Sequence, residues 1–166
     1  AEFLDSISLT PVMGLSTMIM NALGLRPLLQ ICNQKIPLLC AQHLNIDIQE
    51  FNNPDVERIA SKEYFLKELI EVNTKQDLER CIKNMPNFLT KELEAMLECA
   101  SFCEYEESIF SPLFYAPGHY YDDLFYRMIS GNTILVIGGK YTISQTPSCG
   151  FAIYTDSIVD ILLKQS

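Results

Sequence analysis

The sequence lacks the short motifs that most often mark a catalytic or metal site. Its 166 residues contain no G-x-S-x-G nucleophile motif, no glycine-rich phosphate loop and no H-E-x-x-H zinc motif. Six cysteines are present, but no two of them have the C-x-x-C spacing of a zinc site. We therefore expect buried free thiols in a reducing cytoplasmic compartment, with no catalytic residue, no metal ligand and no cofactor.

Positive charge is also scarce. The chain has 12 Lys and Arg against 21 Asp and Glu, which gives a formal net charge of -9. Because the basic residues are scattered singly and form no stripe, we expect no nucleic-acid partner. The apolar run from Ile7 to Leu29 is interrupted by Pro11, Asn21 and Arg26. This run therefore predicts a buried amphipathic helix and no membrane partner.

The pattern of apolar residues changes near residue 104. Before it, helical spacing predominates, as in Leu93, Met96 and Ala100 at positions i, i+3 and i+7. After it, strand-like runs follow, two of them joined by a hairpin connector at 130–132. The expected helices cover about 6–23, 34–43, 62–72, 75–83, 91–103 and 156–164, and the expected strands cover about 27–32, 109–115, 120–129, 133–137 and 149–154. This order predicts a single α+β domain over 1–166, an antiparallel sheet flanked by helices.

Five tyrosines and a Gly-Gly pair lie between Tyr115 and Tyr141. A buried tyrosine brings an apolar ring and a hydroxyl that needs a partner, so several of them on one sheet can form a pocket. They can equally fill the core of a hairpin, and the residues alone leave both interpretations open. Gly138-Gly139 is expected to mark a strand end where the backbone closely approaches another group. Asp122-Asp123 on a strand would diverge, which favours a hairpin rim over a metal site.

Three segments, in this order, resemble histidyl-tRNA synthetases. Tyr120-Tyr121 with Leu124-Phe125 is similar to the Tyr-Tyr…Val-Phe-Glu strand of that family. Gly138-Gly139-Lys140-Tyr141 resembles its Gly-Gly-Arg-Tyr-Asp strand end, and Cys149-Gly150-Phe151-Ala152-Ile153 resembles the strand that begins motif 3 of class II synthetases. The resemblance implies part of a class II synthetase-like core, with a helical insertion over about 34–104 and a strand-rich part over about 109–166. Motifs 1 and 2 are expected upstream of Ala1.

Two departures from the synthetase pattern point to a non-catalytic relative. The arginine that contacts ATP in motif 3 is replaced by Ser157, and the arginine used on the activated amino acid falls near Ala116. A small neutral residue cannot stabilise the charge that develops during adenylation. A synthetase-like core without this chemistry resembles the regulatory subunits of ATP phosphoribosyltransferase, which control the first step of histidine biosynthesis.

This resemblance implies a cytoplasmic histidine sensor that assembles with the short-form catalytic subunit, in homo- and hetero-oligomers. It also implies which residues bind histidine, namely Tyr120, Tyr121, Gly138, Gly139 and Tyr141. Two alternatives stay open, a divergent histidyl-tRNA synthetase core and a scaffold that has lost histidine binding. The scaffold hypothesis draws on the residues beside the tyrosines that depart from the family pattern, Asp122, Asp123, Lys140 and Thr142.

Overall fold

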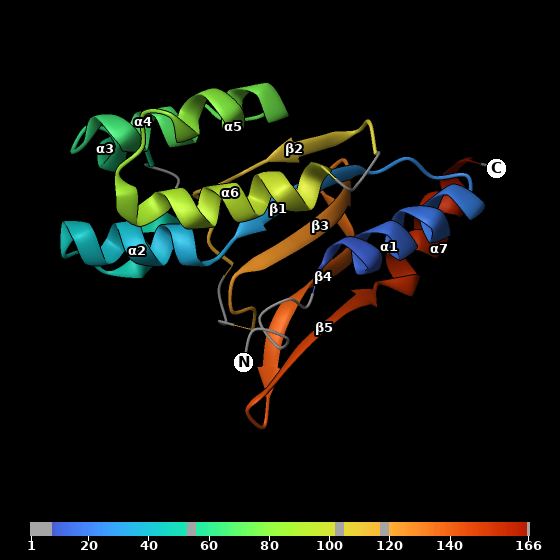
Figure 1. Cartoon of the computed structure of the whole chain (residues 1–166). Coiled ribbons are helices and arrows are strands. Elements are labelled where there is room, and N and C mark those ends of the chain that lie inside the picture. Colours follow the sequence, from blue (N-terminus) through green and yellow to red (C-terminus); the bar gives the residue numbers. More distant parts are fainter. Residues whose placement is uncertain (1–7, 53–55, 102–104, 117–119, 166) are drawn as a thin grey trace.

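The computed structural model describes residues 8–52, 56–101, 105–116 and 120–165 (Figure 1). Along the described chain the elements are α1 (Thr10–Ala22), β1 (Leu28–Asn33), α2 (Lys35–Leu44), the 3-10 helix η1 (Ile48–Asn52), α3 (Val56–Ala60), α4 (Tyr64–Ile70), α5 (Lys75–Ile82), α6 (Asn87–Ser101), β2 (Ser108–Phe110), β3 (Leu124–Ser130), β4 (Thr133–Ile143), β5 (Thr146–Ile153) and α7 (Thr155–Gln165). Most helices precede most strands, so the fold is α+β, as predicted.

The strands form one five-stranded sheet in the order β2-β1-β3-β4-β5. The pairs β1–β3, β3–β4 and β4–β5 are antiparallel, whereas β2 lies parallel to β1. The expected antiparallel pairing is therefore confirmed for these three pairs, and the β1–β2 edge differs from it. The chain reaches β2 from β1 through the helices α2 to α6, and parallel neighbours require a long connection of this kind.

Four predicted strands have the wrong bounds, among them the strand expected over 149–154, which is Thr146–Ile153. The strand expected over 109–115 is only Ser108–Phe110, because the Phe114 N–H donates to the Ser111 carbonyl and turns the chain away from the sheet. The strand expected over 120–129 begins at Leu124. The strand expected to end at 137 continues to Ile143, so Gly138-Gly139 lies inside it. The predicted connector is confirmed, since Gly131 takes the left-handed φ of 60° that suits a tight hairpin turn.

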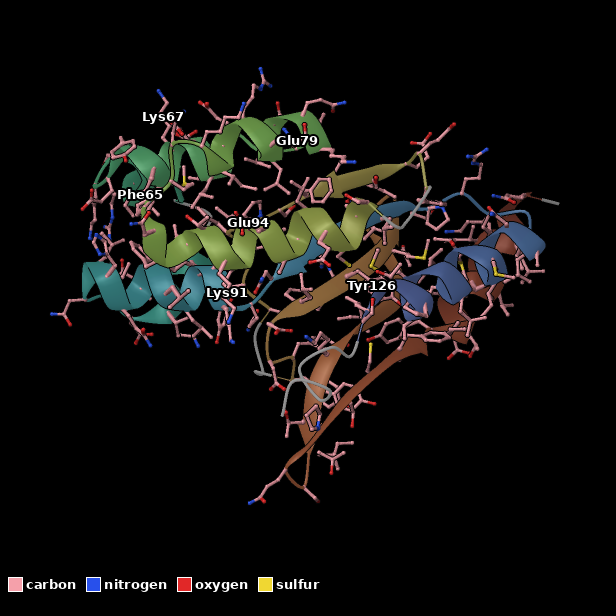
Figure 2. All side chains as sticks on the ribbon, in the orientation of Figure 1. Phe65, Lys67, Glu79, Lys91, Glu94 and Tyr126 are labelled. Carbon is pink, nitrogen blue, oxygen red and sulfur yellow. The ribbon has the colours of Figure 1, made fainter. Side chains whose placement is uncertain are left out.

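Helices α1 and α6 cover the same face of the sheet (Figure 1). The Tyr126 side chain of β3 reaches α1, and it lies between strand and helix in Figure 2. Asn33 at the end of β1 donates from Nδ2 to Glu92 Oε2 of α6 at 3.0 Å. The two helices touch each other where Cys99 Sγ lies 3.5 Å from Met13 Sδ. We call this side of the sheet the helix face and the opposite side the cavity face.

Local sequence signals determine several helix ends. α1 ends before Gly24, as predicted, and this glycine has the left-handed φ of 74° common after helices. The helix expected from residue 91 begins earlier, at Asn87, directly after Pro86, which cannot lie in a helix interior. α5 begins with a capping box, in which Thr74 and Asp77 each accept a backbone N–H from the other.

Candidate functional site

A cavity of about 360 Å³ lies on the cavity face, over β4 and β5. Ile137 and Tyr141 of β4, with Ala152 of β5, line it. Alternate residues of a strand share one face, and Ile137 pairs directly with Ala152, so these side chains form a common floor. The described part of the segment between β2 and β3 supplies a wall, which includes Ala116 and Tyr121.

Tyr120, Tyr121 and Tyr141, which the sequence predicted as site residues, line this cavity together. The ring centroid of Tyr120 lies 5.2 Å from that of Tyr121 and 5.2 Å from that of Tyr141. Tyr154, just after β5, is a fourth lining tyrosine. Burial, reinforced by Tyr154, Tyr120 and Tyr141, raises the pKa of Tyr121 to about 12. The Tyr121 hydroxyl is therefore neutral at physiological pH and can both donate and accept a hydrogen bond.

The two predicted glycines serve opposite faces of the sheet. Tyr121 stacks on the buried Phe125 ring, with centroids 5.4 Å apart and planes 4° apart. A Cβ at Gly139 would collide with the Tyr121 ring and lie 2.7 Å from Phe125 Cβ, so this glycine makes room behind the cavity wall. A Cβ at Gly138 would instead lie 2.7 Å from the Tyr126 ring on the helix face. The structure thus brings Gly139 to the tyrosines and places Gly138 away from them.

Polar groups on the cavity face hold the first part of the wall segment. Gln30 Nε2 donates to Ser111 Oγ at 2.9 Å. The Arg127 guanidinium lies 4.2 Å from the Phe114 ring centroid and donates from Nε to Gln30 Oε1 at 2.8 Å. A guanidinium over an aromatic face is attracted by the ring quadrupole. Ser111 is therefore hydrogen-bonded to β1, and Phe114 packs against Arg127 of β3.

Four of the residues expected to depart from the synthetase pattern form two contacting pairs next to the cavity tyrosines. Thr142 Oγ1 donates to Asp122 Oδ2 at 2.5 Å, and Lys140 Nζ lies 3.5 Å from Asp123 Oδ2. The two carboxylates thus have different partners. The expectation that they lie on a strand is wrong, because both precede β3. None of these four residues is among the described residues that line the cavity, and no described lining residue carries a charge. These four side chains are therefore outside the described lining of the cavity.

Sequence reasoning missed two lining residues in particular, Tyr154 and Gln34. Gly150, Ala152 and Tyr154 alternate along the chain, and this period of two could have identified Tyr154. Gln34 has no comparable signal, because it reaches the cavity only where the end of β1 meets Ala116. The sequence predicts that Ala116 and Ser157 replace two synthetase arginines; Ala116 lines the cavity, and Ser157 lies in the first turn of α7.

Other kinds of site are not seen in the described ranges. Within them, no group of three or more His, Cys, Asp or Glu side chains is placed to hold a metal ion. Nor does any helix in these ranges combine the length and apolar character needed to cross a membrane. Cys103 lies outside the described residues. Of the other cysteines, Cys32, Cys40, Cys81 and Cys99 are buried, as predicted, and Cys149 is partly exposed.

The chain is similar along nearly its whole length to curated bacterial proteins. It is 52% identical over 164 residues to the ATP phosphoribosyltransferase regulatory subunit of Helicobacter hepaticus, and the matched region covers 99% of this chain and 59% of that protein. It is 38% identical over 166 residues to the protein of the same name from Wolinella succinogenes, and the matched region covers 100% of this chain and 58% of that protein. The resemblance to this family is therefore confirmed, although the chain spans about three fifths of these relatives' length. No protein-family model matches the chain.

Solved structures show the same fold at low sequence identity. An ATP phosphoribosyltransferase regulatory subunit/histidyl-tRNA synthetase from Bacillus halodurans matches with a TM-score of 0.75 and 15% identity, over 92% of this chain and 49% of that one. A histidine–tRNA ligase subunit from Alicyclobacillus acidocaldarius matches with a TM-score of 0.67 and 13% identity, over 96% of this chain and 62% of that one. These likenesses concern the fold alone, and they confirm the predicted class II synthetase-like core.

Proposed function

We propose that this chain is the histidine-sensing core of an ATP phosphoribosyltransferase regulatory subunit and has no catalytic activity of its own. The observation that carries the proposal is its 52% identity to a relative of that name. Its proposed partner is the short-form catalytic subunit, with which it forms hetero-oligomers as well as homo-oligomers in the cytoplasm. The net charge of -9 supports a protein partner over nucleic acid. Helices α2 to α6 are the proposed helical insertion.

The chemistry of the cavity supports histidine as the ligand. A neutral imidazole is planar and aromatic, with one nitrogen that donates a hydrogen bond and one that accepts. Tyr120 and Tyr141 offer aromatic faces, Tyr121 offers a neutral hydroxyl, and Ile137 and Ala152 offer an apolar floor. A volume of about 360 Å³ is within the range of small-molecule sites.

The same cavity supports a role without adenylation chemistry. Acyl-adenylate formation requires cations that stabilise the phosphate charge of the transition state. None of the described residues that line the cavity is charged. The resemblance to the synthetases places one of their arginines near Ala116, which is small and neutral. The described lining can therefore bind a small polar molecule, but it offers no cation to stabilise a reacting phosphate.

The test is calorimetric titration of L-histidine into the full-length protein, with and without the short-form catalytic subunit. We expect saturable binding that Tyr121→Ala weakens about tenfold or more, because it removes a buried hydrogen bond and a ring contact. Tyr64→Ala is the matched control, since Tyr64 is 65% exposed on α4 and does not line the cavity.

Each of the other outcomes points to one of the alternatives. No histidine binding by the wild type in either condition contradicts a sensor and favours a scaffold that has lost its ligand. Histidine-dependent ATP–pyrophosphate exchange contradicts the non-catalytic role and favours a divergent synthetase. Equal affinities of wild type and Tyr121→Ala place the histidine site elsewhere.

A further inference from the structure

Gln34, at the junction of β1 and α2, hydrogen-bonds to Ala116 and Asp123, which flank Tyr120 and Tyr121 in the sequence. Gln34 Nε2 donates to the Ala116 carbonyl at 3.0 Å, and the Ala116 N–H donates to Gln34 Oε1 at 3.2 Å. The backbone N–H of Gln34 donates to the Asp123 carbonyl at 2.9 Å. Tyr120 and Tyr121 lie between these two attachment points in the sequence.

Burial and neighbouring hydrogen bonds restrain the position of Gln34. Its side chain is buried, with 1% exposed. Its neighbour Asn33 donates to Glu92 Oε2 on α6 at 3.0 Å, and Asn33 Oδ1 accepts the backbone N–H of Lys35 at 3.0 Å. Because β1 is paired on both edges and Asn33 is bound to α6, Gln34 cannot move without breaking several buried hydrogen bonds.

The backbone of the two tyrosines has less support, although the Tyr121 ring stacks on Phe125. Tyr120 and Tyr121 precede β3 and so lie outside the hydrogen-bonded ladder of the sheet. Tyr120 is 64% exposed, and its ring contacts are with Tyr121 and Tyr141 of the same cavity. A binding site needs its contacting groups held to within a fraction of an ångström by other residues.

We propose that Gln34 is a positioning residue for ligand binding, which holds the wall segment so that Tyr121 stays over the cavity. This role rests on the proposed histidine-sensing function. It is exerted through the two hydrogen bonds to Ala116 and requires no contact between Gln34 and the ligand.

The test compares Gln34→Met with wild type in the full-length protein. Methionine keeps the length and most of the volume of the side chain but removes both hydrogen bonds to Ala116. We expect the dissociation constant for L-histidine, measured by calorimetry, to rise about tenfold. We also expect faster hydrogen exchange of the Ala116 amide by NMR. Gln42→Met, at an exposed position of the following helix α2, should change neither quantity.

A second variant removes only one of the two hydrogen bonds to Ala116. Gln34→Glu keeps an acceptor for the Ala116 N–H but lacks the donor to the Ala116 carbonyl, so it too should bind histidine more weakly than wild type. A Gln34 variant that loses thermal stability yet binds histidine as tightly as wild type overturns the positioning role. A wild type that binds no histidine overturns the proposed function instead, and this role with it.

Discussion

The hydroxyl oxygens of Tyr126 and Ser16 lie 2.5 Å apart, between β3 and α1, with both residues fully buried. Ser16 Oγ also lies 3.0 Å from the Val12 carbonyl, so α1 supplies a further partner. A shift of α1 along the sheet would separate these buried groups, and an unpaired buried hydroxyl is costly. The pair therefore helps to fix the position of α1 on the helix face.

Tyr126→Phe should lower the free energy of unfolding by about 1–2 kcal/mol, because it leaves the Ser16 hydroxyl with fewer partners. Histidine affinity should stay unchanged, since Tyr126 faces away from the cavity. Urea unfolding and calorimetry measure the two quantities. Tyr64→Phe is the control, because this exposed ring should tolerate the loss of its hydroxyl. Equal stability of Tyr126→Phe and wild type would contradict the importance of the pair.

Gly138→Ala and Gly139→Ala should affect different properties, because they face opposite sides of the sheet. An added methyl at Gly138 presses on Tyr126 and should destabilise the fold by about 1–3 kcal/mol. An added methyl at Gly139 displaces Tyr121, so it should also weaken histidine binding about tenfold. Urea unfolding combined with calorimetry separates the two effects.

A third glycine gives the matched control for this pair. At Gly14 in α1 a Cβ would meet no atom within 4 Å, so Gly14→Ala should stabilise the protein by about 0.5–1 kcal/mol. The assignment of Gly138 and Gly139 to different faces fails if both alanine variants change histidine affinity by the same factor.

Asp77 should contribute stability that is lost in acid. Its carboxylate accepts the backbone N–H groups of Thr74 and Asn73, which lowers its pKa from 3.8 to about 2. A pKa that is lower in the folded state means that protonation favours unfolding. The contribution is complete above about pH 4 and declines as the pH falls through 2. Urea unfolding from about pH 5 to pH 2 should show a smaller loss for Asp77→Asn than for wild type. Parallel curves would contradict the prediction.

Cysteine reactivity should follow burial. Burial raises the pKa of Cys40 to about 12 and that of Cys81 to about 11, so neither thiol ionises appreciably at pH 8. Among the described cysteines Cys149 is the one that is partly exposed, so iodoacetamide should modify it before Cys32, Cys40, Cys81 and Cys99. Mass spectrometry of the native protein gives the order, and the urea-unfolded protein is the control. Alkylation of Cys40 as fast as Cys149 would show that the core opens readily.

The sequence by itself determined the features that depend on neighbouring residues. The helical periodicity around Leu93, the glycine after α1 and the Gly131 hairpin turn are local signals, and each marks an element that the structure contains. The class II synthetase-like fold was also accessible, because the tyrosine and glycine segments keep a recognisable order along the chain.

The tertiary structure alone decided which of these residues meet. The parallel pairing of β2, the extension of β4 through Gly138-Gly139 and the opposite faces of these two glycines depend on strands distant in sequence. The contact of Gln34 with Ala116 joins residues 82 positions apart. No local propensity encodes such contacts, because their free energy arises only when the chain has folded and buried both partners.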